Sequence, residues 1–354
     1  MREVNAGTLG AYTTLRLGGP ANRLIEVDNA HETVRLIRES DGKGFPVLLL
    51  AGGSNVVIGD AGFPGTAVVL RSTGVSVRRS GDGQLEITVA AGQTWDDVVA
   101  QAVAEGWSGI ECLSGIPGST GATPIQNVGA YGQEVAETIT SVRVFDRQTD
   151  EVTVMPPGEC GFSYRHSVFK HHDRWVVLEV GFRLAASPLS GPIRYAELAR
   201  TLGVAVGDRV PLAEVREAVL GLRRGKGMVL DDGDPDTYSV GSFFVNPVLD
   251  AAAHADLLRR CEARLGPDVA PPAWPGGDGG VKTSAAWLIE RAGFAKGYQR
   301  DGVGISGKHT LALTNRGSGS SKALLELATE IRDGVRDAFG VTLRPEPVLV
   351  GVTI

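Results

Sequence analysis

The chain has 354 residues, of which 42% are hydrophobic and 21% are charged, and its formal net charge is −6. These values are typical of a globular protein with two or three domains. The sequence has no block of like charges, which argues against nucleic acid or a membrane surface as a partner. The sequence has three separated cysteines, no CxxC pair, no apolar leader after Met1 and no long apolar run. We therefore expect a cytoplasmic protein with reduced thiols, no membrane-spanning segment and no obligate protein partner.

The first 72 residues are predicted to form a β–α–β unit whose second strand ends in a glycine turn. Leu24–Val27 reads as a strand, and Ala30–Glu39 reads as a helix with Asn29 as its cap. Pro46–Ala51 reads as a buried strand, and Gly52-Gly53-Ser54-Asn55 follows it directly. The N–H groups of such a turn suit a phosphate, although the same four residues also form ordinary turns.

Antiparallel strands are predicted to dominate the next part of the chain. One helix is expected there, at Thr94–Glu105, with Thr94 as its N-cap. The predicted strands are Val75–Arg79, Leu85–Ala90, Ile139–Asp146, Glu151–Met155 and Trp175–Leu184.

A long glycine-rich stretch, Ser114–Gly132, lies between that helix and the later strands and carries five glycines, two prolines and no charge. Glycine-dense backbone loses much conformational freedom on folding, and ordered loops longer than about 12–15 residues are usually functional. We predict that the stretch lies against a ligand and offers it backbone N–H groups, as the diphosphate of a large nucleotide cofactor requires. The alternative is a long surface loop.

Helices are predicted to dominate the rest of the chain, because apolar residues recur there at helical spacing. They are expected at Leu212–Leu222, Ala251–Leu265, Ala285–Ala292 and Lys322–Phe339. The other segments are an acidic loop at Gly225–Tyr238, an apolar patch at Gly241–Pro247, a strand at Thr310–Asn315 and an extended tail at Thr342–Ile354.

Gly302–Lys308 matches G-x-G-x-x-G and most of a phosphate-binding P-loop, but its context contradicts both motifs. The polar run Lys296–Asp301 predicts no strand before it, and Thr310–Thr314 alternates as a strand where a helix would be needed. His309 also replaces the hydroxyl residue that would bind Mg²⁺. We expect a turn that leads into a strand.

Three histidines, His166, His171 and His172, cluster in the sequence and raise the question of a metal site. No second ligand group with suitable spacing accompanies them. We expect a polar surface segment and no bound metal.

Several motifs resemble the UDP-N-acetylenolpyruvoylglucosamine reductase family, and they occur in the family's order over nearly the whole chain. Each motif is weak alone, but the ordered set is specific. The motifs are Thr14–Gly19, Ala51–Asn55, Gly115–Gly118 with Pro124–Gly132, Phe162–Ser167, Gly241–Pro247 and Pro345-Glu346.

The resemblance implies an α+β fold, with a two-lobed FAD-binding domain of the vanillyl-alcohol oxidase (PCMH) type followed by an α+β substrate-binding domain. The implied division is residues 1–72 and 73–205 for the two FAD-binding lobes and 206–340 for the substrate-binding domain. Residues 341–354 would form a tail that returns to the FAD lobes and carries Glu346.

The resemblance also implies non-covalent FAD, held across the two glycine-rich segments, and NADPH as co-substrate. The implied FAD-binding residues are Gly52, Gly53, Ser54, Asn55, Gly115, Pro117, Gly118, Ser119, Gly121, Gln126, Asn127, Gly129, Ala130, Tyr131 and Gly132.

The implied reaction is a step of peptidoglycan precursor synthesis. NADPH reduces FAD, and the reduced flavin delivers a hydride to UDP-N-acetylglucosamine enolpyruvate to give UDP-N-acetylmuramate. Hydride addition to one alkene carbon moves negative charge through the other carbon into the substrate carboxylate, and this charge needs preorganised positive or hydrogen-bonding groups. The other alkene carbon then needs a proton. The resemblance makes Ser242 the proton donor and places Arg165 and Glu346 at the other two catalytic positions. Arg165 can engage the carboxylate with two hydrogen bonds, and Glu346 is expected to orient or polarise it.

Four further residues match the positions where the family binds the UDP-sugar: Tyr195, Lys226, Asn246 and Gln299. Tyr195 and Lys226 would contact the diphosphate, and Tyr195 lies in a segment, Ser187–Ala199, that resembles the extra loop of the family's longer subtype. The chain departs from a common pattern at Val245, where a lysine often precedes the asparagine.

Two alternative functions remain. One is a flavin oxidase of the same fold that acts on another alcohol or sugar, although His31 and Cys112 are not obviously placed to tether the flavin. The other is a UDP-sugar-binding protein without catalysis, against which the joint presence of Arg165, Ser242 and Glu346 argues.

Overall fold

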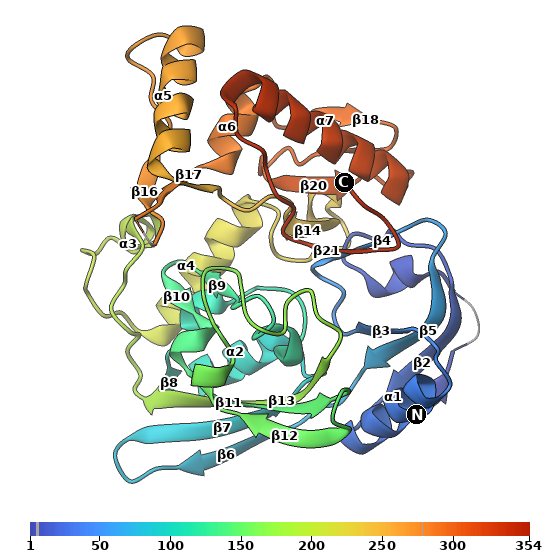
Figure 1. Cartoon of the computed structure of the whole chain (residues 1–354). Coiled ribbons are helices and arrows are strands. Elements are labelled where there is room, and N and C mark those ends of the chain that lie inside the picture. Colours follow the sequence, from blue (N-terminus) through green and yellow to red (C-terminus); the bar gives the residue numbers. More distant parts are fainter. Residues whose placement is uncertain (5–6, 278) are drawn as a thin grey trace. The chain divides into compact units, whose positions relative to one another are not determined.

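The computed structural model describes residues 1–4, 7–277 and 279–354 (Figure 1). The chain divides into two compact units, each built from separate stretches of sequence. The N-terminal unit contains Met1–Gly7, Ala21–Gly53 and Pro64–Val229. The C-terminal unit contains Thr8–Pro20, Ser54–Phe63 and Leu230–Ile354. The domain boundaries at residues 72, 205 and 340 stay a prediction.

The first sheet of the N-terminal unit contains, in order, β1 (Arg2–Glu3), β2 (Ala21–Val27), β5 (Phe63–Leu70) and β3 (Val47–Leu50). Strand β3 runs parallel to β5, with Val47 opposite Thr66, as a β–α–β unit requires. Helix α1 (Ala30–Gly42) precedes β3. The Asn29 side chain accepts the Glu32 N–H at 2.9 Å, so the predicted cap is confirmed.

The second sheet of the N-terminal unit is antiparallel and supports the glycine-rich stretch. It contains, in order, β12 (Glu151–Met155), β11 (Ile139–Asp146), β13 (Trp175–Ala186), β7 (Gln84–Ala90) and β6 (Val75–Arg79), with β8 (Trp107–Ser108) also paired to β13. The side chains of Ile87 and Phe182, which face each other in the β7–β13 register, belong to one buried core. All the strands predicted from alternation in this part of the chain are present.

Three helices of the N-terminal unit surround that stretch in sequence: α2 (Trp95–Ala104), α3 (Ala196–Leu202) and α4 (Leu212–Gly225). Thr94 occupies the N-cap position of α2, as predicted, but its side chain makes no capping hydrogen bond with any described residue. The Trp95 N–H instead donates to the Gly118 carbonyl at 3.0 Å. Helix α3 was not predicted, because it begins within Ser187–Ala199, a segment that resembles an extra loop of the family.

The main sheet of the C-terminal unit contains, in order, β14 (Ser239–Ser242), β20 (Ala312–Asn315), β19 (Val303–Ile305) and β18 (Gln299–Arg300). Helix α7 (Ser321–Phe339) packs against β19 and β20 (Figure 1). Its Leu324, Leu327 and Ile331 are fully buried, as the helical spacing predicts. The sheet and α7 therefore form the core of this unit.

Smaller elements complete the C-terminal unit. They are α5 (Ala251–Leu265), α6 (Ala285–Arg291), a sheet of β15 (Val248–Leu249), β17 (Val281–Thr283) and β16 (Ala273–Pro275), and β4 (Val56–Ile58) paired in parallel with β21 (Val348–Val350). Short elements elsewhere in the chain are β9 (Gly129–Ala130), β10 (Gln133–Glu134) and 3₁₀ helices at Leu9–Tyr12, Glu111–Leu113, Thr120–Ala122, Val135–Glu137, Pro157–Glu159 and Pro235–Thr237.

The structure corrects one detail of Gly302–Lys308. A short strand, β18, does precede Gly302, and it forms a hairpin with β19. The polar sequence of Gln299 and Arg300 misled the prediction because both residues are exposed, and an exposed edge strand needs no apolar side chains. A strand and not a helix follows, as predicted.

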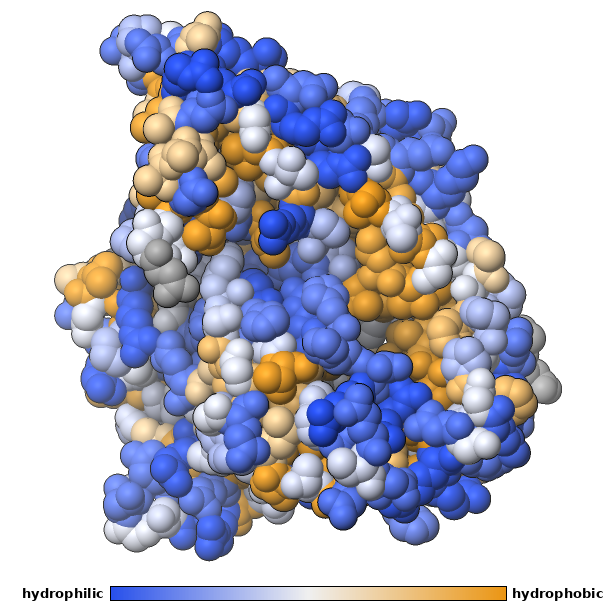
Figure 2. Space-filling view, viewed as in Figure 1, coloured by the Kyte–Doolittle hydropathy of each residue, from blue (hydrophilic) through white to orange (hydrophobic). Residues whose placement is uncertain are grey.

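No helix in the described part of the chain is long and apolar enough to cross a membrane. Figure 2 shows hydrophilic residues over most of the face in view, with apolar residues in separate groups. Large exposed apolar side chains include Val248, Leu258 and Trp274 of the C-terminal unit.

Candidate active site

The two glycine-rich segments meet in the N-terminal unit. A Cβ added at Gly52 would lie 2.4 Å from the Gly118 Cα, a distance that the backbone could not accommodate. Gly53 and Gly118 adopt φ values of 56° and 113°, which favour glycine. The structure therefore brings the predicted cofactor turn and the glycine-rich stretch into direct backbone contact.

Helices α2 and α4 hold the start of the glycine-rich stretch. The Gly115 N–H donates to Asp96 Oδ1 at 2.6 Å, and Arg216 Nη1 and Nη2 donate to the same carboxylate at 2.7 and 2.9 Å. Burial alone would raise the pKa of Asp96, but the Arg216 guanidinium and the Gly115 N–H together lower it below its ordinary value. Asp96 is therefore an anion at neutral pH and anchors the Gly115 turn.

Two buried polar atoms beside this stretch have no hydrogen-bond partner among the described residues: Ser119 Oγ and Arg223 Nε. A buried polar group without a partner is costly, so both atoms suit a polar ligand. Arg223 Nε lies 3.5 Å from the position of a Cβ on Gly115, and burial lowers the Arg223 pKa to about 10, which leaves a cation at neutral pH. These atoms, with the glycine backbone, fit a cofactor that carries phosphate and carbonyl acceptors.

The middle of the stretch is held by Asn127, a residue that is 1% exposed. Its Nδ2 donates to Glu134 Oε2 at 2.8 Å and to the Ser163 carbonyl at 3.1 Å, and its Oδ1 accepts the Ala136 N–H at 3.2 Å. The Asn127 side chain is therefore committed to shaping the loop.

Arg165 is positioned by the same loop. Its Nη2 donates to the Gly129 carbonyl at 2.7 Å, and the Lys170 ammonium donates to the Arg165 carbonyl at 3.1 Å. Arg165, Asn127 and Tyr131 all have left-handed backbones, with φ of 54°, 46° and 48°. Such strain is common at functional sites, but Arg16, Asp150, His171 and Asp301 share it without a predicted role, so the roles of these three residues stay a prediction.

Tyr195 and Lys226 lie together at the far end of the stretch. The Tyr195 and Tyr131 rings meet edge to face at 5.6 Å, and the Lys226 ammonium lies 5.7 Å from the centre of the Tyr131 ring. Lys226 Nζ also donates to Glu197 Oε2 at 2.8 Å. Two residues predicted to bind the diphosphate thus share one cluster with a residue predicted to bind the cofactor.

Ser242 and Glu346 lie on adjacent segments of the C-terminal unit. Ser242 ends β14, and the Glu346 N–H donates to the Phe243 carbonyl at 2.9 Å, while Phe244 bridges to Pro345. The Phe243 and Phe244 rings are buried and pack edge to face at 5.1 Å, which fixes the backbone beside Ser242. The structure therefore places the two segments that carry these predicted catalytic residues side by side.

The Ser54-Asn55 end of the first glycine turn belongs to the same unit as Glu346. The Asn55 carbonyl accepts the Val348 N–H at 3.0 Å, and β4 pairs with β21 immediately after it. The strand that follows Glu346 thus runs beside the turn predicted to bind the cofactor. The convergence of Arg165 with Ser242 and Glu346 stays a prediction.

The other two residues predicted to bind substrate are Asn246, which contacts the start of α6, and Gln299, which lies on the edge strand β18. Asn246 Oδ1 accepts the Ala285 N–H at 3.0 Å, at the first residue of α6. Gln299 is exposed on the edge strand β18, opposite Gly304. Contacts of these residues with a substrate stay a prediction.

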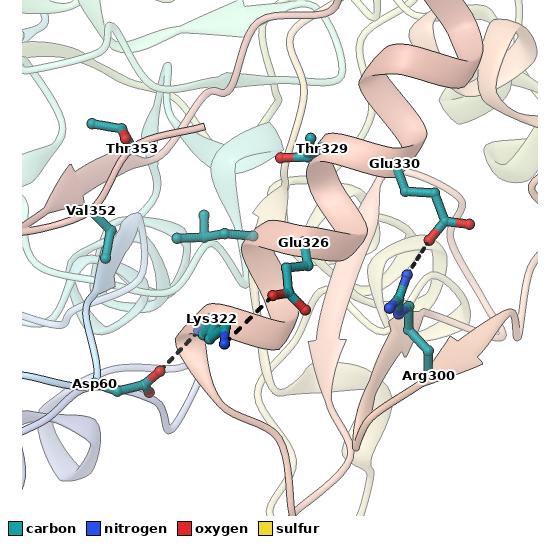
Figure 3. Close-up of a pocket in the computed structure, with 9 residues that line it drawn as sticks. Asp60, Arg300, Lys322, Glu326, Thr329, Glu330, Val352 and Thr353 are labelled. Carbon is teal, nitrogen blue, oxygen red and sulfur yellow. Dashed lines mark hydrogen bonds and ion pairs between the residues drawn. The ribbon is translucent and has the colours of Figure 1, made fainter.

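A separate hollow of about 710 Å³ lies on the C-terminal unit, and Figure 3 shows the charged residues around it. Asp60 accepts the backbone N–H groups of Ser321 and Lys322 at the start of α7, and Arg300 pairs with Glu330 at 2.7 Å. None of the predicted site residues is among the described residues that line it. Its charges stabilise α7 and β18, and they do not form part of the predicted site.

Known proteins resemble the chain over nearly its full length. One family model, described as an FAD binding domain, matches residues 21–154, and another, described as the C-terminal domain of UDP-N-acetylenolpyruvoylglucosamine reductase, matches residues 234–350. The UDP-N-acetylenolpyruvoylglucosamine reductase of Salinispora arenicola is 61% identical over 98% of this chain and 95% of its own length. That of Thermobifida fusca is 57% identical over 98% of this chain and 97% of its own length. The chain belongs to the UDP-N-acetylenolpyruvoylglucosamine reductase family.

A solved UDP-N-acetylenolpyruvylglucosamine reductase, from Thermus caldophilus, shares the fold, with a TM-score of 0.65 and 24% identity over 99% of both chains. The predicted α+β class, an FAD-binding domain followed by a domain specific to the reductase family, is confirmed. As a member of this reductase family, the chain is an FAD-dependent oxidoreductase.

Sequence reasoning missed Asp96, Glu197 and Arg223, although a signal for Arg223 exists. Arg216 and Arg223 are seven residues apart on α4, so they lie on the same helix face, and Arg223 on this face approaches Gly115. Charged residues on the buried face of an amphipathic helix indicate a polar site beneath it. Asp96 and Glu197 offer no comparable signal, because their partners are distant in sequence.

Proposed function

We propose that the chain reduces UDP-N-acetylglucosamine enolpyruvate to UDP-N-acetylmuramate with NADPH. The observation that carries the proposal is the pairing of the Ser242 and Glu346 segments through the Phe243–Glu346 backbone hydrogen bond of 2.9 Å. An acid beside a group that polarises a carboxylate is the arrangement that protonation of an enolate requires. Relatives at 61% and 57% identity carry the name of this reductase.

FAD, when bound, supplies hydride transfer between NADPH and the substrate double bond. The residues that would hold it are those of the Gly52–Asn55 turn and the Gly115–Gly132 stretch, together with Arg223. Support comes from the close contact of Gly52 with Gly118 and from the two buried atoms, Ser119 Oγ and Arg223 Nε, that lack a partner among the described residues.

Ser242 donates the proton in this proposal. Its side chain is partly exposed at the end of β14, while the next residue, Phe243, is fully buried. The hydroxyl is therefore held on a fixed backbone and can still reach a substrate carbon. A serine hydroxyl is a weak acid, so the transfer depends on the negative charge that builds up on that carbon as the hydride arrives.

In this proposal, Arg165 binds the substrate carboxylate and Glu346 orients it. The guanidinium of Arg165 is oriented by the Gly129 carbonyl at 2.7 Å, and a guanidinium fork matches a carboxylate with two hydrogen bonds. Glu346 would orient the same carboxylate from the neighbouring segment of Ser242. The interaction with the Arg165 guanidinium grows stronger as the enolate forms, which is the condition for catalysis.

The nucleotide half of the substrate would lie on Tyr195 and Lys226, with Asn246 and Gln299 as further contacts. Support comes from the cluster of Tyr131, Tyr195 and the Lys226 ammonium, which offers aromatic rings and a cation to a diphosphate. We also propose that the chain works in the cytoplasm, where NADPH and UDP-sugars are made, without nucleic acid or a membrane as partner. The net charge of −6 agrees with this.

Steady-state assays of the yellow holoenzyme test the proposed reaction. NADPH consumption should depend on added enolpyruvyl UDP-sugar, and UDP-N-acetylmuramate should form in equal amount. Rapid reoxidation of the flavin by oxygen with a simple alcohol would indicate an oxidase instead. A colourless protein that still binds the UDP-sugar would indicate a binding protein without catalysis.

A further inference from the structure

An ion pair ties the two elements that present the diphosphate-binding candidates. Lys226 follows the last residue of α4, and Glu197 lies in the first turn of α3, two residues after Tyr195. Their charged atoms are 2.8 Å apart, and each side chain is 35% exposed. The carboxylate thus occupies a hydrogen-bonding position on the ammonium that the proposed function assigns to a phosphate.

The surroundings of Lys226 make this pair more than a surface contact. Burial alone would lower the pKa of Lys226, but the Glu197 carboxylate and the Tyr131 phenol group raise it above its ordinary value. The ammonium is therefore a cation that the protein has partly removed from water and neutralised with one carboxylate. A ligand phosphate that binds Lys226 must share the ammonium with Glu197 or displace it.

We infer that Glu197 is a positioning residue that gates Lys226: its carboxylate neutralises the ammonium while no anion is bound and competes with a nucleoside diphosphate for it. The inference rests on the proposed assignment of Lys226 to the diphosphate. A like charge beside the binding position weakens binding, since two unit charges repel at distances of a few ångströms. Substrate and product of the proposed reaction carry the same diphosphate, so the gate would hasten product release as well as weaken substrate binding.

The test is calorimetric titration of the FAD-bound holoenzyme with UDP, for the parent and for Glu197→Gln. The variant should bind UDP roughly fivefold more tightly at low ionic strength, because one repelling charge is gone. The gain should shrink as salt approaches physiological strength, where the screening length is about 8 Å. In steady state, KM for the UDP-sugar should fall while kcat does not rise. Glu197→Asp keeps the charge and should restore the parent values.

A matched control comes from a second ion pair of the same segment, between Arg194 and Glu137. Glu137 accepts from Arg194 Nη1 at 2.8 and 2.9 Å, and Arg194 directly precedes Tyr195. The pKa of Lys226 is shifted by Glu197, Tyr131 and Tyr195, and Glu137 is not among the causes of that shift. Glu137→Gln removes the same charge and loosens the same segment, so it should leave UDP affinity and its salt dependence unchanged. Unchanged or weaker UDP binding in Glu197→Gln overturns the gate, and so does an equal gain in Glu137→Gln, since that would reflect a loosened segment.

Lys226→Gln separates this inference from the proposed function. If that variant binds UDP as tightly as the parent, Lys226 does not hold the diphosphate and the gate fails with that assignment. If it binds UDP more weakly while Glu197→Gln shows no gain, the assignment stands and the gate alone is wrong.

Discussion

Gly52 illustrates how a single residue type decides the shape of the cofactor region. The position tolerates no Cβ, because one would lie 2.4 Å from the Gly118 Cα and 3.0 Å from the Gly118 carbonyl carbon. Both obstacles are backbone atoms, so no rotamer change can relieve the clash. The glycine is needed by the protein's own packing, in addition to any ligand that lies on the turn.

Gly52→Ala should separate the two glycine-rich segments. We expect a loss of about 1–3 kcal/mol in the free energy of unfolding, the usual cost of overpacking, and a lower ratio of flavin to protein after purification. Gly42→Ala is the control: nothing lies within 4 Å of a Cβ there, and Gly42 ends α1. Full flavin content and parent stability in Gly52→Ala would contradict the contact.

Asn127 and Asn246 match the family's motifs, and each also makes side-chain hydrogen bonds within the protein. The Asn127 side chain forms hydrogen bonds with Glu134, Ser163 and Ala136. Asn246 Oδ1 accepts the Ala285 N–H of α6. The motifs identify these positions from the sequence, but the partners are 7 to 39 residues away, so their hydrogen bonds require the folded structure.

At the scale of elements, α2 and α4 act as a clamp on the Gly115 turn. Asp96 of α2 accepts the Gly115 N–H at 2.6 Å and receives two hydrogen bonds from Arg216 of α4. Both side chains are mostly buried, so loss of one partner leaves the other charge without compensation.

Asp96→Asn should destabilise the protein in a pH-dependent way. The pKa of Asp96 is lower in the folded than in the unfolded state, so its contribution to stability is full above the unfolded pKa of about 3.9 and is lost as pH falls through the folded value. The difference in Tm between parent and variant should therefore be constant from about pH 5 to 7 and shrink below about pH 4. Thermal melts from acid to neutral pH measure it. A difference that grows on acidification would contradict the assignment.

The regular elements of this chain follow from its sequence more closely than the contacts between them. Helix α7 and the strands of the second sheet were expected from spacing alone, because a repeated apolar face reports burial directly. Helix α3 and strand β18 were missed, since α3 is short and β18 is exposed. The contact of Gly52 with Gly118 has no sequence signal at all. A glycine indicates that another group approaches the backbone closely, but it does not identify that group.

At the scale of the whole molecule, each unit is assembled from distant stretches of the chain. Leu15, Leu17 and Val57 are buried in the core of the C-terminal unit, although they precede its main stretch by more than 170 residues. The β4–β21 pairing joins Val56 to Val348. The core of the C-terminal unit is thus built from three separate stretches of sequence.

A fragment of residues 230–354 should therefore fail to fold alone. It lacks the Thr8–Pro20 and Ser54–Phe63 segments, which supply buried apolar side chains and the partner strand of β21. We expect little cooperative unfolding by circular dichroism and poor amide dispersion by NMR, compared with the intact chain. A sharp thermal transition of the isolated fragment would contradict the discontinuous unit.

The central claim is that Ser242 gives the proton while FAD relays the hydride, and stopped-flow measurement of the two half-reactions of Ser242→Ala tests it most directly. Ser239→Ala is the control on the same strand: Ser239 Oγ accepts the Gly241 N–H at 3.2 Å and has no predicted role in the reaction, so both half-reactions of this variant should stay near the parent rates. In Ser242→Ala, flavin reduction by NADPH should remain near normal, while reoxidation by the enolpyruvyl UDP-sugar should slow by about 10²–10⁴-fold. Equal slowing of both half-reactions, or no slowing of the second, would contradict the account.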